Sequence, residues 1–319
     1  MNGMTRWKTI ATLALATACS TGDKMGEETA TDTDTDTDTD TDTDTDTDTD
    51  TASGPPPGPI GPHGETITGP HGGSMVRITA GAFDMGCTRD QLDQCLDNER
   101  PVRTVTLTHD FYIGETELTQ GEYESVMGTN PSDDSDCGSD CPVEKVSWTT
   151  AAVFANALSS SAGLTECYTC GDSDEGFSCE VAMSPYECDG YRLPTEAEWE
   201  GAARCDEERM YAGSNDLGLV GWHTGNSDGG LHPVAGKEAN DCGLYDMSGN
   251  VWEWAQDWMA SYEAAETTDP EGPETAGNRV HRGGSWDSAG SRARVSHRDE
   301  NSPGFVTGDL GFRLARTVP

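Results

Sequence analysis

The sequence predicts a single α+β domain with much irregular structure over residues 75–316. Short runs rich in β-branched residues, Met75–Ile78 and Val102–Leu107, are typical of strands. Two separate Thr-x-x-Glu patterns mark the starts of helices. The C-terminal third is dominated by Gly, Asn, Asp and Trp, which favours turns held together by packed indole rings. About 240 residues of this kind are enough for one substantial core.

The helices are predicted from their capping signals. In a capping box the Thr hydroxyl accepts a hydrogen bond from the third helical amide, and the Glu side chain accepts one from the amide of the Thr. Such boxes at Thr119 and Thr195 predict a helix that ends near Gly128 and another that ends near Arg204. A third helix is expected after Trp148, because a run of small and apolar residues follows it.

The first 19 residues have the pattern of a secretory signal peptide. Arg6 and Lys8 precede an apolar stretch, Thr9–Ala18, which is too short to span a bilayer as a mature helix. Ala16–Cys19 is similar to a bacterial lipobox, in which the Cys becomes the lipid-modified first residue of the mature protein. We therefore expect lipidation at Cys19 and a location in the cell envelope, at the outer membrane or cell surface. An ordinary cleaved signal peptide is the alternative.

Residues 20–53 are predicted to be a disordered spacer. Thr31–Thr51 is a Thr-Asp repeat that holds ten aspartates and no apolar residue, so it has nothing to bury and its charges repel one another. Residues 54–74 are dominated by Pro and Gly and are predicted to be linker. The formal net charge is −39, and most of it lies outside the repeat, which argues against nucleic acid as a partner.

Ten cysteines follow Cys19 in the sequence: Cys87, Cys95, Cys137, Cys141, Cys167, Cys170, Cys179, Cys188, Cys205 and Cys242. An even number in an exported chain predicts disulfides, and close pairs such as the first two suggest bridged local loops. The sequence leaves the pairing open. The alternative is a zinc site formed by the Cys-x-x-Cys pair at Cys167 and Cys170 with the next two cysteines, because four thiolates satisfy a tetrahedral ion.

Four sequence blocks occur in a characteristic order. They are Phe83–Gly86, Tyr191–Glu200, Gly243–Trp254 and Arg282–Trp286, and Gly311–Arg313 closes the last. Together they resemble the sulfatase-modifying-factor family, whose enzymes generate formylglycine, over essentially the whole domain. The resemblance implies a mixed α and β fold with little regular secondary structure, related to C-type lectin domains.

The resemblance also implies a chemistry that this sequence does not support. The family's enzymes oxidise a cysteine in a Cys-x-Pro-x-Arg motif to formylglycine with molecular oxygen and copper(I), and two cysteines five residues apart bind the copper. Here those positions hold Ser288 and Ala293, and no cysteine follows Cys242. Copper(I) selects soft sulfur ligands, so copper is not expected. Trp252 and Ser285 match other pocket positions.

A structural calcium site is a further implication of the resemblance, with four residues as ligands: Asp246, Gly249, Val251 and Glu253. Two carboxylates and two main-chain oxygens on a Gly-containing turn suit a hard cation. The alternative is a buried carboxylate that accepts amide hydrogen bonds. Asn226 and Ser227 match part of a second family calcium site, but the segment that would supply its other ligands is shortened between Asp228 and His232.

Arginines near the C-terminus are candidates for ligand binding. Arg292, Arg294 and Arg298 could receive an acidic or carboxylate-bearing ligand, because guanidinium groups pair bidentately with such anions. In the alternative interpretation they lie on a strand and pair with nearby Asp and Glu of the chain. Arg282 and Arg313 belong to family motifs and are expected to be structural.

The function favoured by the sequence is a surface binding module without copper-dependent formylglycine-generating activity. It would be anchored to the membrane by a lipid, stabilised by calcium and disulfides, and would bind a protein, peptide or glycan. The first alternative is a formylglycine-generating oxidase that oxidises cysteine in sulfatases, or a related oxidation with a relocated metal site. The second is a mainly structural component of the envelope.

Overall fold

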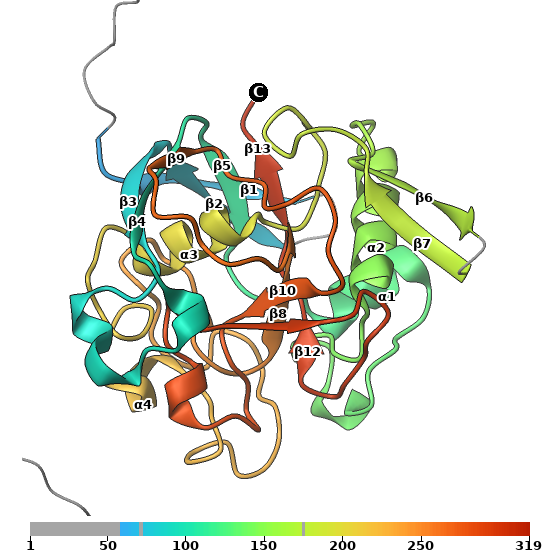
Figure 1. The fold of residues 1–319 in the computed structure, drawn as a ribbon. Coiled ribbons are helices and arrows are strands. Elements are labelled where there is room, and N and C mark those ends of the chain that lie inside the picture. Colours follow the sequence, from blue (N-terminus) through green and yellow to red (C-terminus); the bar gives the residue numbers. More distant parts are fainter. Residues whose placement is uncertain (1–57, 70–72, 174–175) are drawn as a thin grey trace, which may run out of the picture. The chain divides into compact units, whose positions relative to one another are not determined.

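The computed structural model describes residues 58–69, 73–173 and 176–319 (Figure 1). The predicted signal peptide, the lipidation residue Cys19 and the Thr-Asp spacer lie outside the described residues. The helices are α1 (Gln120–Met127), α2 (Trp148–Ser161), α3 (Glu196–Arg204) and α4 (Leu217–Val220), and the strands are β1 (Gly61–Thr68), β2 (Ser74–Thr79), β3 (Gly81–Met85), β4 (Arg103–Leu107), β5 (Phe111–Gly114), β6 (Tyr168–Ser173), β7 (Gly176–Val181), β8 (Trp252–Trp258), β9 (Thr267–Thr268), β10 (Arg279–Arg282), β11 (Arg298–Asn301), β12 (Leu310–Gly311) and β13 (Ala315–Thr317).

The strands form several small sheets. One sheet has the order β1-β2-β5-β13 with antiparallel neighbours. A second has the order β11-β10-β8-β12, in which β12 runs parallel to β8. A third joins β3, β4 and β9, and β6 and β7 form a separate hairpin. Helix α3 contacts strands of two sheets, β3 and β4 on one side and β8 and β10 on the other, while α2 contacts the β6–β7 hairpin (Figure 1).

The helix boundaries follow the capping signals. Thr119 and Thr195 each accept a hydrogen bond from the third helical amide of α1 and α3, and in each box the Glu side chain accepts one from the Thr amide. Gly128 ends α1 in the left-handed conformation at φ 72°. Ser147 caps α2 through its hydroxyl. All three predicted helices are therefore confirmed, because their signals are local.

The predicted linker of residues 54–74 contains a strand. Within it, β1 pairs antiparallel with β2, with an irregularity in register between Pro62 and Thr66. Every residue of β1 is exposed or half-buried. An edge strand held by main-chain hydrogen bonds needs no alternation of apolar residues and tolerates Pro at an irregularity. The Pro-rich and Gly-rich composition therefore gave no signal for this strand. The folded domain begins earlier than residue 75.

Five disulfides join all ten cysteines of the described residues: Cys87–Cys95, Cys137–Cys141, Cys167–Cys188, Cys170–Cys179 and Cys205–Cys242. The predicted disulfide framework is confirmed. The zinc alternative is wrong, because its four sulfurs are shared between two disulfides and a zinc site needs thiolates.

Tryptophan side chains occupy the centre of the domain. Trp148, Trp199 and Trp254 are fully buried. The indole N–H of Trp148 donates to the carbonyl oxygen of Ala255 at 3.0 Å, and that of Trp254 donates to the carbonyl oxygen of Val146 at 2.8 Å. Strand β8 is buried along almost its whole length, and its residues Trp252 and Trp254 belong to one of the apolar clusters of the core. Indole packing therefore organises the short strands of the C-terminal third.

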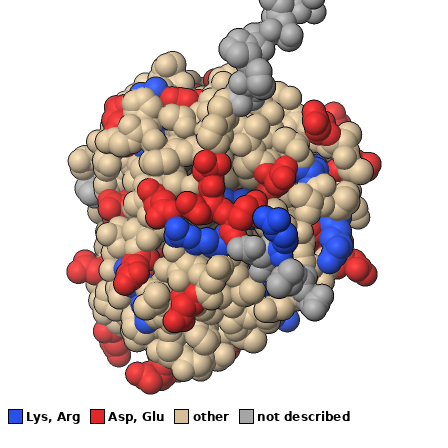
Figure 2. Space-filling model, turned by 90° about the vertical axis from the view of Figure 1, so that its left-hand side faces the viewer, with Lys and Arg blue, Asp and Glu red and all other residues tan. Residues whose placement is uncertain are grey.

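The surface carries many charges. Figure 2 shows acidic side chains gathered near the middle of one face, with basic side chains along their lower border. Asp84, Asp206, Glu207 and Glu208 help to line a shallow depression on the domain. The described domain is therefore acidic in its own right, apart from the Thr-Asp repeat. Among the described residues there is no helix with the length and apolar character needed to cross a membrane.

Candidate functional site

Ser285 and Ser288 lie together at the turn that follows β10. Ser285 is fully buried; its hydroxyl lies 2.9 Å from the Ser288 hydroxyl and donates to a carboxylate oxygen of Asp309 at 2.7 Å. Gly284 has a φ of 74°, and a Cβ there would lie 2.9 Å from the Cα of Ala293. Only glycine allows this close approach. The backbone therefore brings the turn of Gly284 and Ser285 against both Ser288 and Ala293, the two positions that match the copper ligands of the family's enzymes.

Neither position offers a copper ligand. Ala293 is fully buried, and its methyl group belongs to an apolar cluster with Tyr211, Leu217 and Val220. The hydroxyl of Ser288 is engaged with Ser285. All cysteines of the described residues are in disulfides, so this part of the chain has no free thiolate to replace the missing pair.

Trp252, at the start of β8, lies against two buried histidines. Its ring centroid is 4.8 Å from that of His281 and 5.7 Å from that of His297. Nδ1 of His281 and Nε2 of His297 are buried without a hydrogen-bond partner. Burial lowers both pKa values, that of His281 to about 4, so the two imidazoles are neutral at pH 7. Sequence spacing gave no sign of this pair, because the two residues lie on separate segments.

Asp246 has the free oxygen that a metal ligand needs. Its backbone has a φ of 57°, and its Oδ2 accepts a hydrogen bond from the amide of Ala235 at 2.7 Å. Its Oδ1 is buried without a partner. Burial raises the pKa of Asp246 to about 6. The alternative of a carboxylate satisfied by amide hydrogen bonds therefore accounts for only one of the two oxygens.

Glu117 is a nearby carboxylate that the sequence interpretation missed. It accepts hydrogen bonds from the side chain of Asn250 at 2.7 Å and the amide of Val251 at 2.9 Å. Burial, followed by the charges of Asp246 and Glu253, raises its pKa well above the ordinary value. The separation of more than one hundred residues from the other carboxylates left no local signal.

Among the described residues Glu253 forms an ion pair, whereas Asp246 and Glu117 do not. Glu253 accepts hydrogen bonds from Arg313 on both oxygens, at 2.6 Å each, and its Oε2 also accepts from Trp199 at 2.7 Å. Within the described part of the chain, Arg313 is thus the guanidinium paired with one of three buried carboxylates, Glu117, Asp246 and Glu253. Each carboxylate oxygen has two acceptor positions, so Oε1 of Glu253 retains one. A free Asp246 oxygen beside two further buried carboxyl groups fits a divalent cation bound by oxygen.

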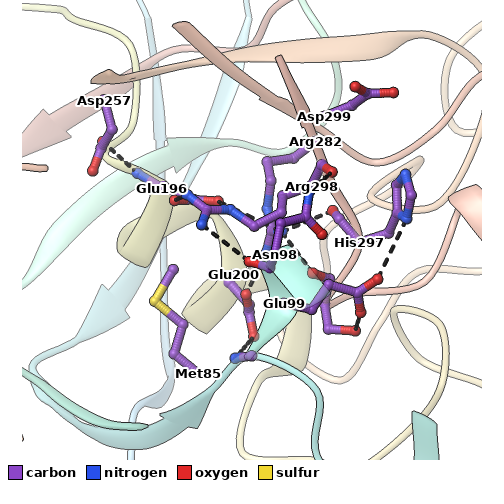
Figure 3. A network of polar contacts seen from close by, with 12 residues as sticks. Met85, Asn98, Glu99, Glu196, Glu200, Asp257, Arg282, His297, Arg298 and Asp299 are labelled. Atoms are coloured by element: carbon purple, nitrogen blue, oxygen red, sulfur yellow. Dashed lines mark hydrogen bonds and ion pairs between the residues drawn. The ribbon is translucent and has the colours of Figure 1, made fainter. Parts of the chain in front are cut away.

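The arginines near the C-terminus are paired within the chain, and Figure 3 shows Arg298 beside Glu196. Arg294 donates two hydrogen bonds of 2.6 Å to Glu99, and Arg298 donates to Glu196 at 2.8 and 2.6 Å. Arg292 pairs with Asp299 at 2.9 Å on the surface. The alternative in which these arginines pair with acids of the chain is confirmed. They do not alternate on one strand, since only Arg298 belongs to β11.

Acidic residues of α3 receive the other guanidinium groups of this network. Glu200 accepts from Arg204 at 2.8 Å and from Arg282. Arg282 also donates to carbonyl oxygens of the segment before β11, including that of Ser296 at 2.9 Å. The motif arginine at position 282 therefore has the structural role expected for it, which is to hold the last third of the chain on α3.

The profile of the family described as "Sulfatase-modifying factor enzyme 1-like domain" matches residues 65–318. The chain belongs to this family. Its fold also resembles solved structures. The match to Treponema denticola variable protein 1 has a TM-score of 0.71 and 33% identity, and it covers 80% of this chain and 99% of the Treponema protein. The match to PvdO from Pseudomonas aeruginosa has a TM-score of 0.63 and 25% identity, and it covers 81% of this chain and 99% of PvdO. The predicted α+β, C-type-lectin-like fold class is confirmed.

Curated relatives within the sulfatase-modifying factor family carry different names. A formylglycine-generating enzyme of Streptomyces coelicolor is 34% identical over 76% of this chain and 88% of its own length. "Chaperone protein LppX" of Paenibacillus barcinonensis is 34% identical over 67% of this chain and 82% of its own length. Membership of the family therefore does not select one activity.

The second calcium site suggested by the family pattern is poorly supported by its two residues. The side-chain oxygen of Asn226 accepts the amide of His223 at 2.8 Å, and the carbonyl oxygen of Ser227 lies 2.9 Å from a ring nitrogen of His232. The Ser227 hydroxyl donates to the carbonyl oxygen of Trp286 at 2.9 Å. These groups hold the loop to its neighbours and leave the side-chain oxygen of Asn226 occupied by the main chain.

Proposed function

We propose that this chain is a binding module of the sulfatase-modifying factor family that does not carry out copper-dependent oxidation of cysteine. One observation carries the proposal: the two ligand positions hold the hydroxyl of Ser288 and the methyl group of Ala293, while the cysteines of the described domain are in disulfides. A hydroxyl and a methyl group do not bind copper(I), which requires soft ligands such as thiolates. The relative named as a chaperone supports a protein or peptide ligand over a glycan.

Two measurements on the full chain test the missing oxidation. Competition with a copper(I) chelator should show no tight binding, and incubation with a Cys-x-Pro-x-Arg peptide, copper and oxygen should leave the peptide thiol intact by mass spectrometry. The double variant Ser288→Cys, Ala293→Cys is the matched control, because it restores both sulfurs in the same backbone. Aldehyde formation by the unaltered chain would overturn the proposal.

An oxidase remains the second candidate for a specific reason. Formylglycine-generating enzymes are among the relatives that match most of the chain. In addition, His281 and His297 each present an unpartnered ring nitrogen beside Trp252, and imidazole binds transition metals. A relocated metal site would use these nitrogens. Replacing both histidines by Gln would then abolish an aldehyde signal seen in the unaltered chain and would have no such effect under the binding-module proposal.

We further propose that the chain is exported and anchored through a lipid on Cys19. The N-terminal pattern supports it, and five disulfides suit an oxidising compartment. In the producing bacterium, Cys19→Ala should move the protein from the membrane fraction to the soluble or secreted fraction. Retention of that variant in the membrane would contradict lipid anchoring, while loss of disulfides from the isolated protein would contradict export.

Structural calcium at the Asp246 turn is the remaining proposal on this site. Asp246 and Glu253 would supply carboxylate oxygens, and Gly249 and Val251 would supply main-chain oxygens. The unpartnered Oδ1 of Asp246 and the excess of carboxylates, Glu117 included, support it. A bound divalent cation would neutralise this excess and stabilise the fold by mass action.

A further inference from the structure

Arg279 differs from the other buried arginines of the described residues. Seven arginines are buried there, and six of them form an ion pair with a glutamate. These pairs are Arg192–Glu198, Arg204–Glu200, Arg282–Glu200, Arg294–Glu99, Arg298–Glu196 and Arg313–Glu253. Arg279 is 2% exposed and has no ion pair among the described residues. The fold therefore buries one guanidinium without a direct ion pair, because Glu180 and Asp257, whose charges act on it, do not reach ion-pair distance.

The surroundings of Arg279 hold its guanidinium in one orientation. Its central carbon lies 3.8 Å from the ring centroid of Trp148 and 3.6 Å from that of Trp258, so indole rings contact it on two sides. Nη1 donates to the carbonyl oxygen of Gln256 at 2.6 Å, and Nε is buried without a partner. Burial lowers the pKa of Arg279 to about 10, which still leaves the group charged at neutral pH. An anion is the missing partner of such a group.

Arg279 lines a cavity of about 310 Å³ whose other walls come from the end of β7, from β8 and from the loop of residues 271–274. The other lining residues are Glu180, Val181, Ala182, Met183, Gln256, Trp258, Glu271, Gly272, Pro273 and Glu274. This volume is at the lower end of the range for small-molecule sites. The glutamates that line it are exposed, whereas Arg279 is buried. A positive base therefore lies beneath a negative rim.

We propose that this cavity binds a small zwitterion of amino-acid size. The carboxylate of the ligand pairs with Arg279, its ammonium group faces Glu271 and Glu274, and its apolar part contacts Trp258 and Met183. A simple anion would be repelled by the rim, and a simple cation would be repelled by Arg279. The cavity does not include Ser285 or Ser288, so the inference goes beyond the proposed function and does not depend on it.

Isothermal titration calorimetry of the full chain tests the choice of ligand. Glycine, L-leucine and L-lysine serve as zwitterionic probes, while acetate and n-butylamine each carry one of the two charges. At least one amino acid should bind at one site per chain, and acetate and n-butylamine should bind about tenfold more weakly or worse, since each lacks one charge-assisted hydrogen bond. The absence of binding by all three amino acids, or equal binding of acetate, would overturn the inference.

Variants locate the site. Glu274→Gln should weaken amino-acid binding and should strengthen acetate binding, because it removes one negative charge of the rim. Glu124→Gln on the exposed face of α1 is the matched control. Arg279→Lys should reduce binding of both probes, because the planar fork is lost. Met183→Trp fills the cavity mouth without removing a buried group, so it remains informative if the Arg279 variant does not fold. Unchanged amino-acid affinity in folded Met183→Trp would place the ligand elsewhere.

Discussion

Removal of the charge on Glu99 should be among the most destabilising conservative changes in this domain. Glu99 is fully buried and accepts hydrogen bonds of 2.6 Å from both Nη atoms of Arg294 and from the Ser296 hydroxyl. Glu99→Gln retains the shape of the side chain but leaves the Arg294 guanidinium buried without a counter-charge. Such a loss costs about 3–5 kcal/mol of unfolding free energy. The thermal midpoint should fall by roughly 2–4 °C for each kcal/mol in a domain of this size.

The pH dependence gives the same prediction an independent check. Burial by itself would raise the pKa of Glu99, but hydrogen bonds from His297, Arg294 and Ser296 hold it well below the ordinary value of 4.5. A lowered folded-state pKa contributes stability above the unfolded-state pKa, and this contribution is lost as the pH falls below about 4.5. The unaltered protein should therefore lose stability on acidification, and Glu99→Gln should lose less of it over the same interval.

Urea unfolding followed by circular dichroism at pH 7 and pH 4 measures both effects. Asp299→Asn is the control, because it removes the exposed pair with Arg292 and should cost under about 1 kcal/mol. The double variant Glu99→Gln, Arg294→Met should recover part of the lost stability, since it no longer buries an unpaired charge. If Glu99→Gln is no less stable than the Asp299 control at pH 7, the account of this network is refuted.

Four further outcomes are expected. Burial raises the pKa of Asp257 to about 7, so this group contributes stability at low pH that is lost as the pH rises from about 4 through 7; Asp257→Asn should flatten that part of the profile in unfolding measurements at pH 5.5 and 8. Thr195→Ala removes the hydroxyl that accepts from the Glu198 amide in a capping box and should cost about 1 kcal/mol by urea unfolding. Chelation with EDTA should lower the thermal midpoint of the unaltered chain but not of Asp246→Asn, and an unchanged midpoint would exclude stabilisation by calcium. Replacing Cys205 and Cys242 by Ala opens a bridge with a sequence separation of 37, which should cost roughly 4 kcal/mol in the chain-entropy description; a loss near zero would place the constraint elsewhere.

The parts of the fold with local signals were predictable. The boxes at Thr119 and Thr195 are satisfied within four residues of chain, so the caps of α1 and α3 follow from short sequence windows. The order of the four sequence blocks was likewise sufficient to indicate the family, and the match to the family profile confirms it. Ser288 and Ala293 could be assigned to the copper positions by counting along one segment, and no tertiary information was needed for that.

The edge strand and the buried charges could not be predicted in this way. Strand β1 forms through main-chain hydrogen bonds to β2, which its Pro-rich and Gly-rich sequence did not suggest. Glu117 reaches the Asp246 turn from another part of the chain, and Glu99 reaches Arg294 across 195 positions. Such contacts depend on where the backbone places each side chain, because the sequence around a single carboxylate does not indicate which distant residue will pair with it.

The sequence by itself determined the family, the helix starts, an even set of cysteines and the absence of the thiol pair at Ser288 and Ala293. Those features are either local hydrogen-bonding patterns or the presence and absence of particular atoms. Only the tertiary structure decided the disulfide pairing, the ion pairs of Arg294 and Arg298 with glutamates of the chain, and the burial of Arg279 without an ion pair. The reason is physical: burial sets the energy of a charge, and burial is a property of the whole packed chain.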